Sequence, residues 1–272
     1  MFEITFETKC YENDWEYLLK TSHLEHMIAA CQTPFTFRQL IINNVAAPET
    51  VAHYAQKKVD AGVIDAFYFV DDYIADALKA YGLTREALGK GYYYSCSELV
   101  GIYLSKTKFH LHFSGDAFMV AAKSPVGWIT EACRLLDSDP QYFVANPTWN
   151  YRFDKAKQES FGHIGNFYVG YGFSDQCYLI RAADFQAPIY GYEHELSARY
   201  PAYGGELFEK RVDAYMRTHQ RLRLVSTTET YIHRNFRKSK LYRRMALWWL
   251  GHGTRDVWRF FRLAYYKHRR GI

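Results

Sequence analysis

The sequence predicts an α/β fold in which a mostly parallel sheet is flanked by helices. Short apolar runs alternate with stretches of helical periodicity along the first half of the chain. Polar residues follow three of these runs, at the points where parallel strands would end. The chain has 272 residues, of which 49% are hydrophobic and 18% aromatic, so a sizeable core is expected. This composition excludes a disordered, collagen-like or low-complexity protein.

The first elements are expected in the order β-α-β-α-β. Apolar and polar side chains alternate over residues 2–6 as in a strand, and a polar loop is expected over 8–14. Pro48 lies near the first turn of a second helix, a position that proline tolerates well. The remaining elements of this unit are a helix over 15–31, strands over 35–42 and 66–70, and the second helix over 48–61.

The second half of the body has weaker patterns. Residues 151–174 are rich in Gly, Tyr and Phe with little periodicity, which predicts a long loop or irregular meander. Helices are expected over 95–105, 128–136 and 206–220, strands over 108–113, 177–181 and 222–225, and an apolar run covers 142–147.

The charge is unevenly distributed, with a net −6 over residues 1–233 and +11 over 234–272. We therefore expect a body over 1–235 and a basic tail over 236–272, whose partner is anionic. The tail contains two amphipathic helical patterns that combine tryptophan and arginine, as in segments that lie at a bilayer surface. Packing of these helices on the body or on a second subunit is the alternative. An acidic body without a nucleic-acid module predicts that the chain binds no nucleic acid.

Cysteine usage and the termini indicate a reducing compartment. Neither a signal peptide nor an apolar stretch of about 20 residues is visible, so we expect a cytoplasmic protein, peripheral on the inner face of the plasma membrane. The cysteines are odd in number, widely spaced and without a C-x-x-C pair: Cys10, Cys31, Cys96, Cys133 and Cys177.

The polar residues at strand ends predict a ligand crevice, because ligands of open α/β sheets bind beyond the carboxyl ends of the strands. The order of elements over residues 1–235, together with these polar ends, resembles the GT-A fold of nucleotide-sugar glycosyltransferases, most closely the bacterial family 2 type. The resemblance implies that nucleotide contacts come from the opening loop and the strand ends: Thr8, Cys10, Tyr11, Glu12, Asn43, Asn44 and Asp71.

The segment Ser114-Gly115-Asp116 resembles the DxD site of that family, with serine in place of the first aspartate. The resemblance implies that Asp116 holds Mn²⁺ or Mg²⁺, which prefer oxygen ligands, while Ser114 and Gly115 contact the donor. A simple turn after a strand is the alternative interpretation.

The segment that contains Glu206 and Glu209 is similar to the Gly-Gly-Glu-Asp stretch of the family, which implies that one of them is the catalytic base. Glu193 and Glu195 are a third possibility. Both Glu206 and Glu209 could instead only complement the dipole of a helix start.

His233 resembles the terminal histidine of the family, which implies a metal or diphosphate contact; a packing role is the alternative.

The resemblance implies a metal-dependent, inverting hexosyltransferase. It would transfer a sugar from a nucleotide sugar, with UDP expected, to a glycan or lipid-linked acceptor in bacterial lipopolysaccharide or capsule synthesis. Aromatic loops such as 149–151 would stack on sugars or close as a lid. A non-catalytic glycan- or membrane-binding adaptor with a decayed site and a sugar nucleotidyltransferase are the alternatives, although the basic glycine-rich phosphate loop of the latter is missing.

Overall fold

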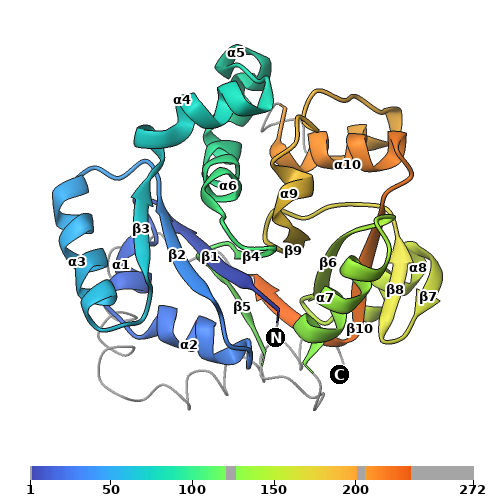
Figure 1. The fold of residues 1–272 in the computed structure, drawn as a ribbon, viewed down its shortest axis with the longest axis horizontal. Coiled ribbons are helices and arrows are strands. Elements are labelled where there is room, and N and C mark those ends of the chain that lie inside the picture. Colours follow the sequence, from blue (N-terminus) through green and yellow to red (C-terminus); the bar gives the residue numbers. More distant parts are fainter. Residues whose placement is uncertain (1, 121–126, 201–205, 234–272) are drawn as a thin grey trace.

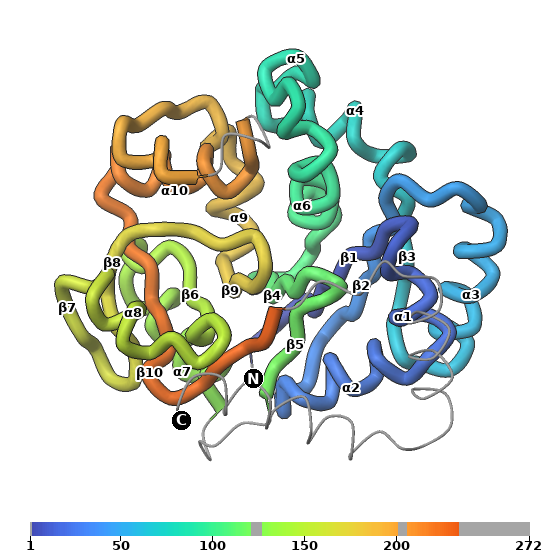
Figure 2. Tube along the Cα trace, turned by 180° about the vertical axis from the view of Figure 1, so that it is seen from behind, coloured from blue at the N-terminus to red at the C-terminus, as the bar shows by residue number. Residues whose placement is uncertain are grey.

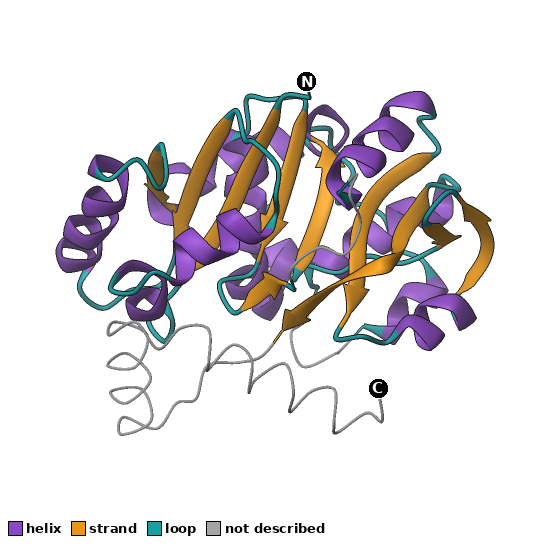
Figure 3. Ribbon diagram, turned by 90° about the horizontal axis from the view of Figure 1, so that it is seen from below, coloured by secondary structure: helices purple, strands orange, loops and turns teal. Residues whose placement is uncertain are grey.

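A computed structural model describes residues 2–120, 127–200 and 206–233 of the chain. The predicted tail helices after residue 235 and the pair Gly204-Gly205 lie outside these described residues. Figure 1 shows a central sheet with helices packed around it, and Figure 3 shows that helices cover both faces of the strands. The predicted α/β class is therefore confirmed.

The sheet is mixed, with a parallel half that comes from the first part of the chain. Its strands follow the order β3-β2-β1-β4-β9-β6-β10-β8-β7, and β5 pairs with β10 outside this path. Neighbours among β3, β2, β1 and β4 are parallel, whereas β9 runs antiparallel to both β4 and β6. The strands are β1 (Ile4–Cys10), β2 (Phe37–Ile42), β3 (Ala66–Phe69), β4 (Phe109–Phe113), β5 (Ala117–Met119), β6 (Tyr142–Trp149), β7 (Ser160–Ile164), β8 (Phe167–Gly170), β9 (Cys177–Arg181) and β10 (Leu222–His233).

Two buried clusters, one on each face of the sheet, form the core. The first contains side chains of α1, α2, α3 and α7, and the second contains side chains of α4, α6, α9 and α10. The helices are α1 (Trp15–Leu19), α2 (His23–Ala30), α3 (Pro48–Asp60), α4 (Val70–Tyr81), α5 (Arg85–Leu88), η1 (Gly89–Gly91), α6 (Tyr92–Leu104), α7 (Trp128–Ser138), α8 (Phe153–Gln158), α9 (Ala182–Phe185), η2 (Glu195–Arg199) and α10 (Phe208–Thr218).

The predicted helix over 15–31 is wrong at its centre, where the structure has two helices. Thr21 Oγ1 donates a hydrogen bond to the carbonyl of Tyr17 and accepts one from the amide of His23 at 3.1 Å. A side chain that binds the backbone in this way competes with helical hydrogen bonds, and the helix ends at Leu19.

The irregular meander expected over 151–174 is also wrong, because it contains α8 and the antiparallel pair β7–β8. Gly165 has a φ of 51° in the two-residue connection between these strands, where glycine adopts a left-handed backbone without strain. The last strand of the body, expected over 222–225, extends to His233. Its register with β6 shifts between Val225 and Thr230. Because the alternation of side chains is interrupted there, the sequence pattern does not predict the second part of the strand.

Candidate functional site

Asp116 and His233 meet at the carboxyl end of β4. Ser114 and Gly115 form a turn there, in which the Ala117 amide donates to the Ser114 carbonyl at 2.8 Å. Strand β5 then pairs antiparallel with the end of β10, with Ala117 opposite His233 (Figure 2). As a result, His233 Nε2 lies 3.3 Å from Asp116 Oδ1. The turn that we considered as an alternative is present, and it is what brings the predicted aspartate to the predicted histidine.

Asn150 fixes the backbone of His233. Its side-chain Oδ1 accepts a hydrogen bond from the His233 amide at 3.0 Å, and its Nδ2 donates to the His233 carbonyl at 3.3 Å. Asn150 itself has a φ of 47°, a left-handed conformation that asparagine tolerates better than most residues. The end of β10 is therefore held by β5 on one side and by Asn150 on the other.

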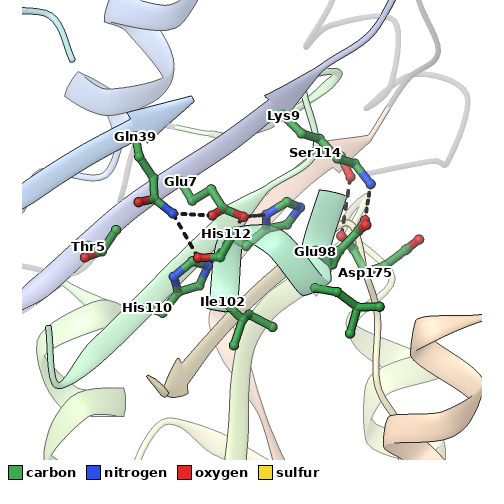
Figure 4. Close-up of polar contacts among 12 residues, drawn as sticks. Thr5, Glu7, Lys9, Gln39, Glu98, Ile102, His110, His112, Ser114 and Asp175 are labelled. Atoms are coloured by element: carbon green, nitrogen blue, oxygen red, sulfur yellow. Dashed lines mark hydrogen bonds and ion pairs between the residues drawn. The ribbon is translucent and has the colours of Figure 1, made fainter. Parts of the chain in front are cut away.

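Lys9 lies at the centre of a group of acidic side chains on the face of the sheet that α6 and α10 cover. It forms an ion pair with Glu98 of α6, whose side chain is fully buried, and Figure 4 shows the two pointing toward each other. The charges of Asp175 and Asp116 also act on Lys9, and the charge of Lys9 acts on Glu209. We call these five residues the Lys9 cluster: Lys9, Glu98, Asp116, Asp175 and Glu209.

The protonation of the Lys9 cluster follows from its excess of acids. Burial opposes the charge on Lys9, but the carboxylates of Glu98, Asp175 and Asp116 outweigh it and raise the pKa of the Lys9 ammonium. Burial likewise opposes ionisation of Asp116, yet the hydrogen bond and charge of His233, with the charge of Lys9, lower the pKa of Asp116. Asp116 is therefore ionised at neutral pH and available as a ligand.

Glu209 and Glu206 occupy different environments. Burial and the charge of Asp175 raise the pKa of Glu209 to about 8, and the Glu209 carboxylate accepts a hydrogen bond from the Asp175 backbone. Glu206 instead forms an ion pair with Lys210 at 2.6 Å. Glu209 also lies in the first turn of α10, as a dipole-complementing acid would. Of the two glutamates, Glu209 is the one in the Lys9 cluster, while Glu193 and Glu195 are exposed near η2.

The predicted opening loop is shorter than expected, because β1 continues to Cys10. Thr8 and Cys10 are 0% and 1% exposed, so their side chains face the core rather than a ligand. Tyr11 is 43% exposed, and its phenol is near enough to Asp116 and Lys9 for their charges to influence its pKa. Glu12 Oε2 accepts a hydrogen bond from the Ala46 amide at 2.8 Å, which ties this loop to the one after β2.

The polar residues after β2 and β3 differ in exposure. The Asn43 side chain is buried and donates to Cys96 Sγ at 3.2 Å, whereas Asn44 is exposed with a φ of 48°. Asp71 does not follow the strand directly, since β3 ends at Phe69 and Asp71 lies exposed in the first turn of α4.

Sequence reasoning did not identify Lys9, Glu98 or Asp175 as members of the site. Glu98 did carry a signal, since it is the only acid within the largely apolar segment 92–104. Asp175 lies between Ser174 and Gln176 in a region that we expected to be loop, where an acid is unremarkable.

The donor set fits a divalent cation that is shared with a phosphate ligand. A half-buried carboxylate and a half-buried imidazole within 3.3 Å of each other offer an oxygen and a nitrogen to one ion. Mg²⁺ and related ions typically take one or two protein carboxylates and complete their coordination with water and substrate phosphates. The three carboxylates of Glu98, Asp116 and Asp175 around one lysine also leave an excess of negative charge that a cation would offset.

Neither a family model nor a curated protein matches the sequence. Among solved structures, the chain is similar to GalNAc-T7 crystallised with UDP, GalNAc and Mn²⁺. The TM-score is 0.53 and the identity 9%, over 86% of this chain and 44% of that one. The chain has a GT-A fold. The fold predicted from the order of elements is thus confirmed.

Two further structures are similar at lower scores. Glucosyl-3-phosphoglycerate synthase from Mycobacterium tuberculosis, with Mn²⁺, UDP and phosphoglyceric acid, has a TM-score of 0.45 and 12% identity over 91% of this chain and 78% of that one. Galactosyltransferase LgtC, with donor and acceptor sugar analogues, has a TM-score of 0.38 and 13% identity over 67% of this chain. The chain spans 59% of the length of LgtC and 60% of the TarS fragment from S. aureus.

Among the described residues, no helix combines the length and apolar character that crossing a bilayer requires.

Proposed function

We propose that the chain is a metal-dependent glycosyltransferase that uses a nucleotide sugar, with UDP as the expected nucleotide. The observation that carries this proposal is the Asp116–His233 pair beside Lys9. The pair lies at the carboxyl ends of β1 and β4, two central strands of a GT-A sheet. Tyr11 and Asn44 are exposed at the neighbouring loop ends and are our candidates for nucleotide contacts.

The proposed chemistry depends on stabilising the departing diphosphate. Asp116 and His233 would hold Mn²⁺ or Mg²⁺, which supplies positive charge to the diphosphate oxygens. Lys9, whose ammonium keeps its proton because of its acidic neighbours, adds a second positive charge at the same strand ends.

Glu209 is our candidate for the catalytic base of an inverting transfer. In such a reaction a bond forms between the acceptor oxygen and the sugar carbon, the bond from that carbon to the diphosphate breaks, and the acceptor proton passes to Glu209. A carboxylate with a pKa of about 8 holds that proton far better than an ordinary glutamate. Glu206 remains a weaker candidate because its charge is paired with Lys210.

A cavity of about 180 Å³, lined in part by the two residues that flank Asp175 in the chain, is our candidate acceptor site. Ser174 and Gln176, on either side of Asp175, line it together with Trp149 and Arg152. The guanidinium of Arg152 lies over the Trp149 ring, 4.2 Å from its centroid, so one face of the indole is covered by a cation and the other face is our candidate for stacking on a sugar.

We extend the proposal to the biological setting through the basic tail. A segment with net charge +11 that combines tryptophan and arginine would attach the protein to an anionic membrane surface. A glycan or lipid-linked acceptor in bacterial surface polysaccharide synthesis is consistent with such an attachment.

Calorimetric titration of the full chain with UDP, GDP, ADP and CDP tests the proposal, each with and without Mn²⁺. We expect one nucleotide, UDP, to bind in a manner that depends on Mn²⁺, and Asp116→Asn to abolish that dependence. Absence of binding by every nucleotide in both conditions would overturn the proposal.

Hydrolysis of UDP-sugars in the absence of acceptor then separates an enzyme from an adaptor. A glycosyltransferase is expected to turn over slowly with Mn²⁺ present. Binding of UDP without any turnover would instead support the adaptor.

A further inference from the structure

We propose that Glu7, His110 and His112 bind a transition-metal ion, with Zn²⁺ as the expected ion, at a structural site inside the sheet. This site is separate from the Asp116–His233 pair and does not depend on the proposed transferase activity. Among the described residues, these three form the one group of at least three His, Cys, Asp or Glu side chains whose ligand atoms converge.

Two of the three ligands belong to a row of polar side chains that crosses four adjacent strands in register. Glu7 of β1 is paired with Gln39 of β2 on one side and with His112 of β4 on the other, and His112 is paired with Tyr178 of β9. We call these four residues the Glu7 row; Figure 4 shows Glu7 between Gln39 and His112, with His110 alongside. Because the four side chains lie on one face, they meet beneath α6.

Unpaired polar atoms point to a ligand in this place. Glu7, His110 and His112 are all 0% exposed. His110 has no hydrogen-bond partner at either ring nitrogen, and His112 Nε2 has none. Buried polar atoms without partners are costly, and native structures satisfy nearly all of them. A metal ion would use a lone pair that no protein donor reaches.

Two of the three separations between ligand atoms are close to those around a tetrahedral ion, and all three atoms lie within 4.8 Å of one another. Glu7 Oε1 lies 2.8 Å from His112 Nδ1 and 3.5 Å from His110 Nε2. Ligands at about 2.0 Å from tetrahedral zinc stand roughly 3.3 Å from one another. The longer of the two separations already fits, and the shorter one needs a shift of only about half an ångström. Two imidazoles and one carboxylate are a ligand set that zinc favours.

Charge also favours a cation. The Glu7 carboxyl is 0% exposed, and its Oε1 lies within 3.5 Å of a ring nitrogen of each histidine. An ionised carboxylate without contact to water requires a positive partner. A divalent ion supplies it and engages His110 as well, which the Glu7–His112 hydrogen bond alone leaves unpaired.

The surroundings hold the ligands in position. Gln39 Nε2 donates to Glu7 Oε2 at 2.6 Å and to the Gly101 carbonyl at 3.0 Å, while its Oε1 has no partner. The Tyr178 ring stacks on His112 at 4.7 Å between centroids, and its hydroxyl is also unpaired. Support of this kind orients ligating side chains in known metal sites.

Metal analysis of the full chain, purified without chelator or affinity metal, tests the proposal. After dialysis against metal-free buffer, we expect stoichiometric zinc in the wild type and in Asp116→Asn, which lacks the donor-site carboxylate. His112→Gln should lose the zinc, whereas His163→Gln, an exposed histidine of β7, should keep it.

Cobalt substitution gives a second measurement that needs no variant. Wild-type protein reloaded with Co²⁺ should show the intense visible absorption of a tetrahedral site. Two results would overturn the proposal: wild-type protein that takes up neither Zn²⁺ nor Co²⁺ even when incubated with excess metal, or His112→Gln that folds and still binds stoichiometric zinc. The first would mean that the Glu7 row is a plain network of hydrogen bonds.

Discussion

The Lys9 cluster and the Glu7 row share one face of β1, yet they are built for different tasks. Lys9 follows Glu7 by two residues on β1, so both side chains project from one face of the strand. At the carboxyl ends of β1 and β4, which we call the edge, the side chains of Lys9, Asp116 and His233 are 23%, 16% and 21% exposed. The side chains of Glu7, His110 and His112 are 0% exposed. Ligands can therefore enter and leave at the edge, whereas the interior row can only stabilise the fold.

The strongest test of this contrast is Asp116→Asn, which keeps the shape of the side chain and removes its charge. If the edge binds the donor metal, kcat/KM should fall by about a thousandfold or more, because transition-state charge loses several kcal/mol of stabilisation. The free energy of unfolding should also fall, because the charge of Asp116 interacts favourably with His233 and Lys9 in the folded state. Steady-state kinetics and urea unfolding measure the two effects.

Asp72→Asn is the matched control, since Asp72 is an exposed acid in the first turn of α4. It should leave both quantities unchanged. An Asp116→Asn enzyme with wild-type kinetics would remove the edge site from the mechanism.

Glu209→Gln should reduce kcat by about a hundredfold to a thousandfold, within the range of lost general bases. Because the pKa of Glu209 is about 8, kcat/KM of the wild type should rise with pH until about pH 8 and then level off. The variant should lack this rise. A pH profile that is identical in the two proteins would contradict the assignment.

The same pKa predicts the opposite trend for stability. Between the ordinary glutamate pKa of about 4.5 and the folded value of about 8, the folded state holds a proton that the unfolded state has released. The contribution of Glu209 is therefore greatest at low pH and is lost as the pH rises through this window. Urea unfolding from pH 5 to pH 9 should show a slope that Glu209→Gln reduces.

Gly101→Ala should damage the interior row and spare the edge. A Cβ added at Gly101 would overlap the Glu7 carboxylate, so the carboxylate or the helix backbone would have to move. We expect a loss of about 3 kcal/mol in the free energy of unfolding, even though alanine favours helices more than glycine.

Gly191→Ala is the control, because nothing lies within 4 Å of its added Cβ. Its free energy of unfolding should stay within about 0.5 kcal/mol of the wild type. Equal stability of the two alanine variants would show that the row is not packed as described.

The smallest expected effect comes from Asn150→Gly, which keeps the left-handed backbone and removes the two hydrogen bonds to His233. Mn²⁺-dependent UDP binding should weaken about fivefold, equivalent to about 1 kcal/mol. Gln32→Gly, another left-handed residue between α2 and β2, should leave binding unchanged. Calorimetry distinguishes the two variants, and equal affinities would refute a positioning role for Asn150.

The parallel half of the fold was predictable because its strands are short, apolar and separated by helices with clear periodicity. Resemblance also pointed to Asp116 and His233, and the structure brings these two together. The pairing itself could not be derived from periodicity, because β10 passes through a register shift before it reaches β5.

The composition of the Lys9 cluster was not predictable for a different reason. Lys9, Glu98, Asp175 and Glu209 come from a strand, two helices and a connection, and each is unremarkable in its own segment. Glu7 lies just after the strand expected over 2–6 and His112 within the strand expected over 108–113, but a sequence does not reveal that β1 and β4 are neighbours in this register.

The antiparallel pairing of β5 with the end of β10 has a consequence for synthesis of the protein. Asp116 leaves the ribosome long before His233, so a nascent chain carries half of the pair throughout translation of the C-terminal half of the body. Asp116 and His233 come together only when β10 docks on the sheet. Prematurely terminated products that lack β10 would thus lack the Asp116–His233 pair.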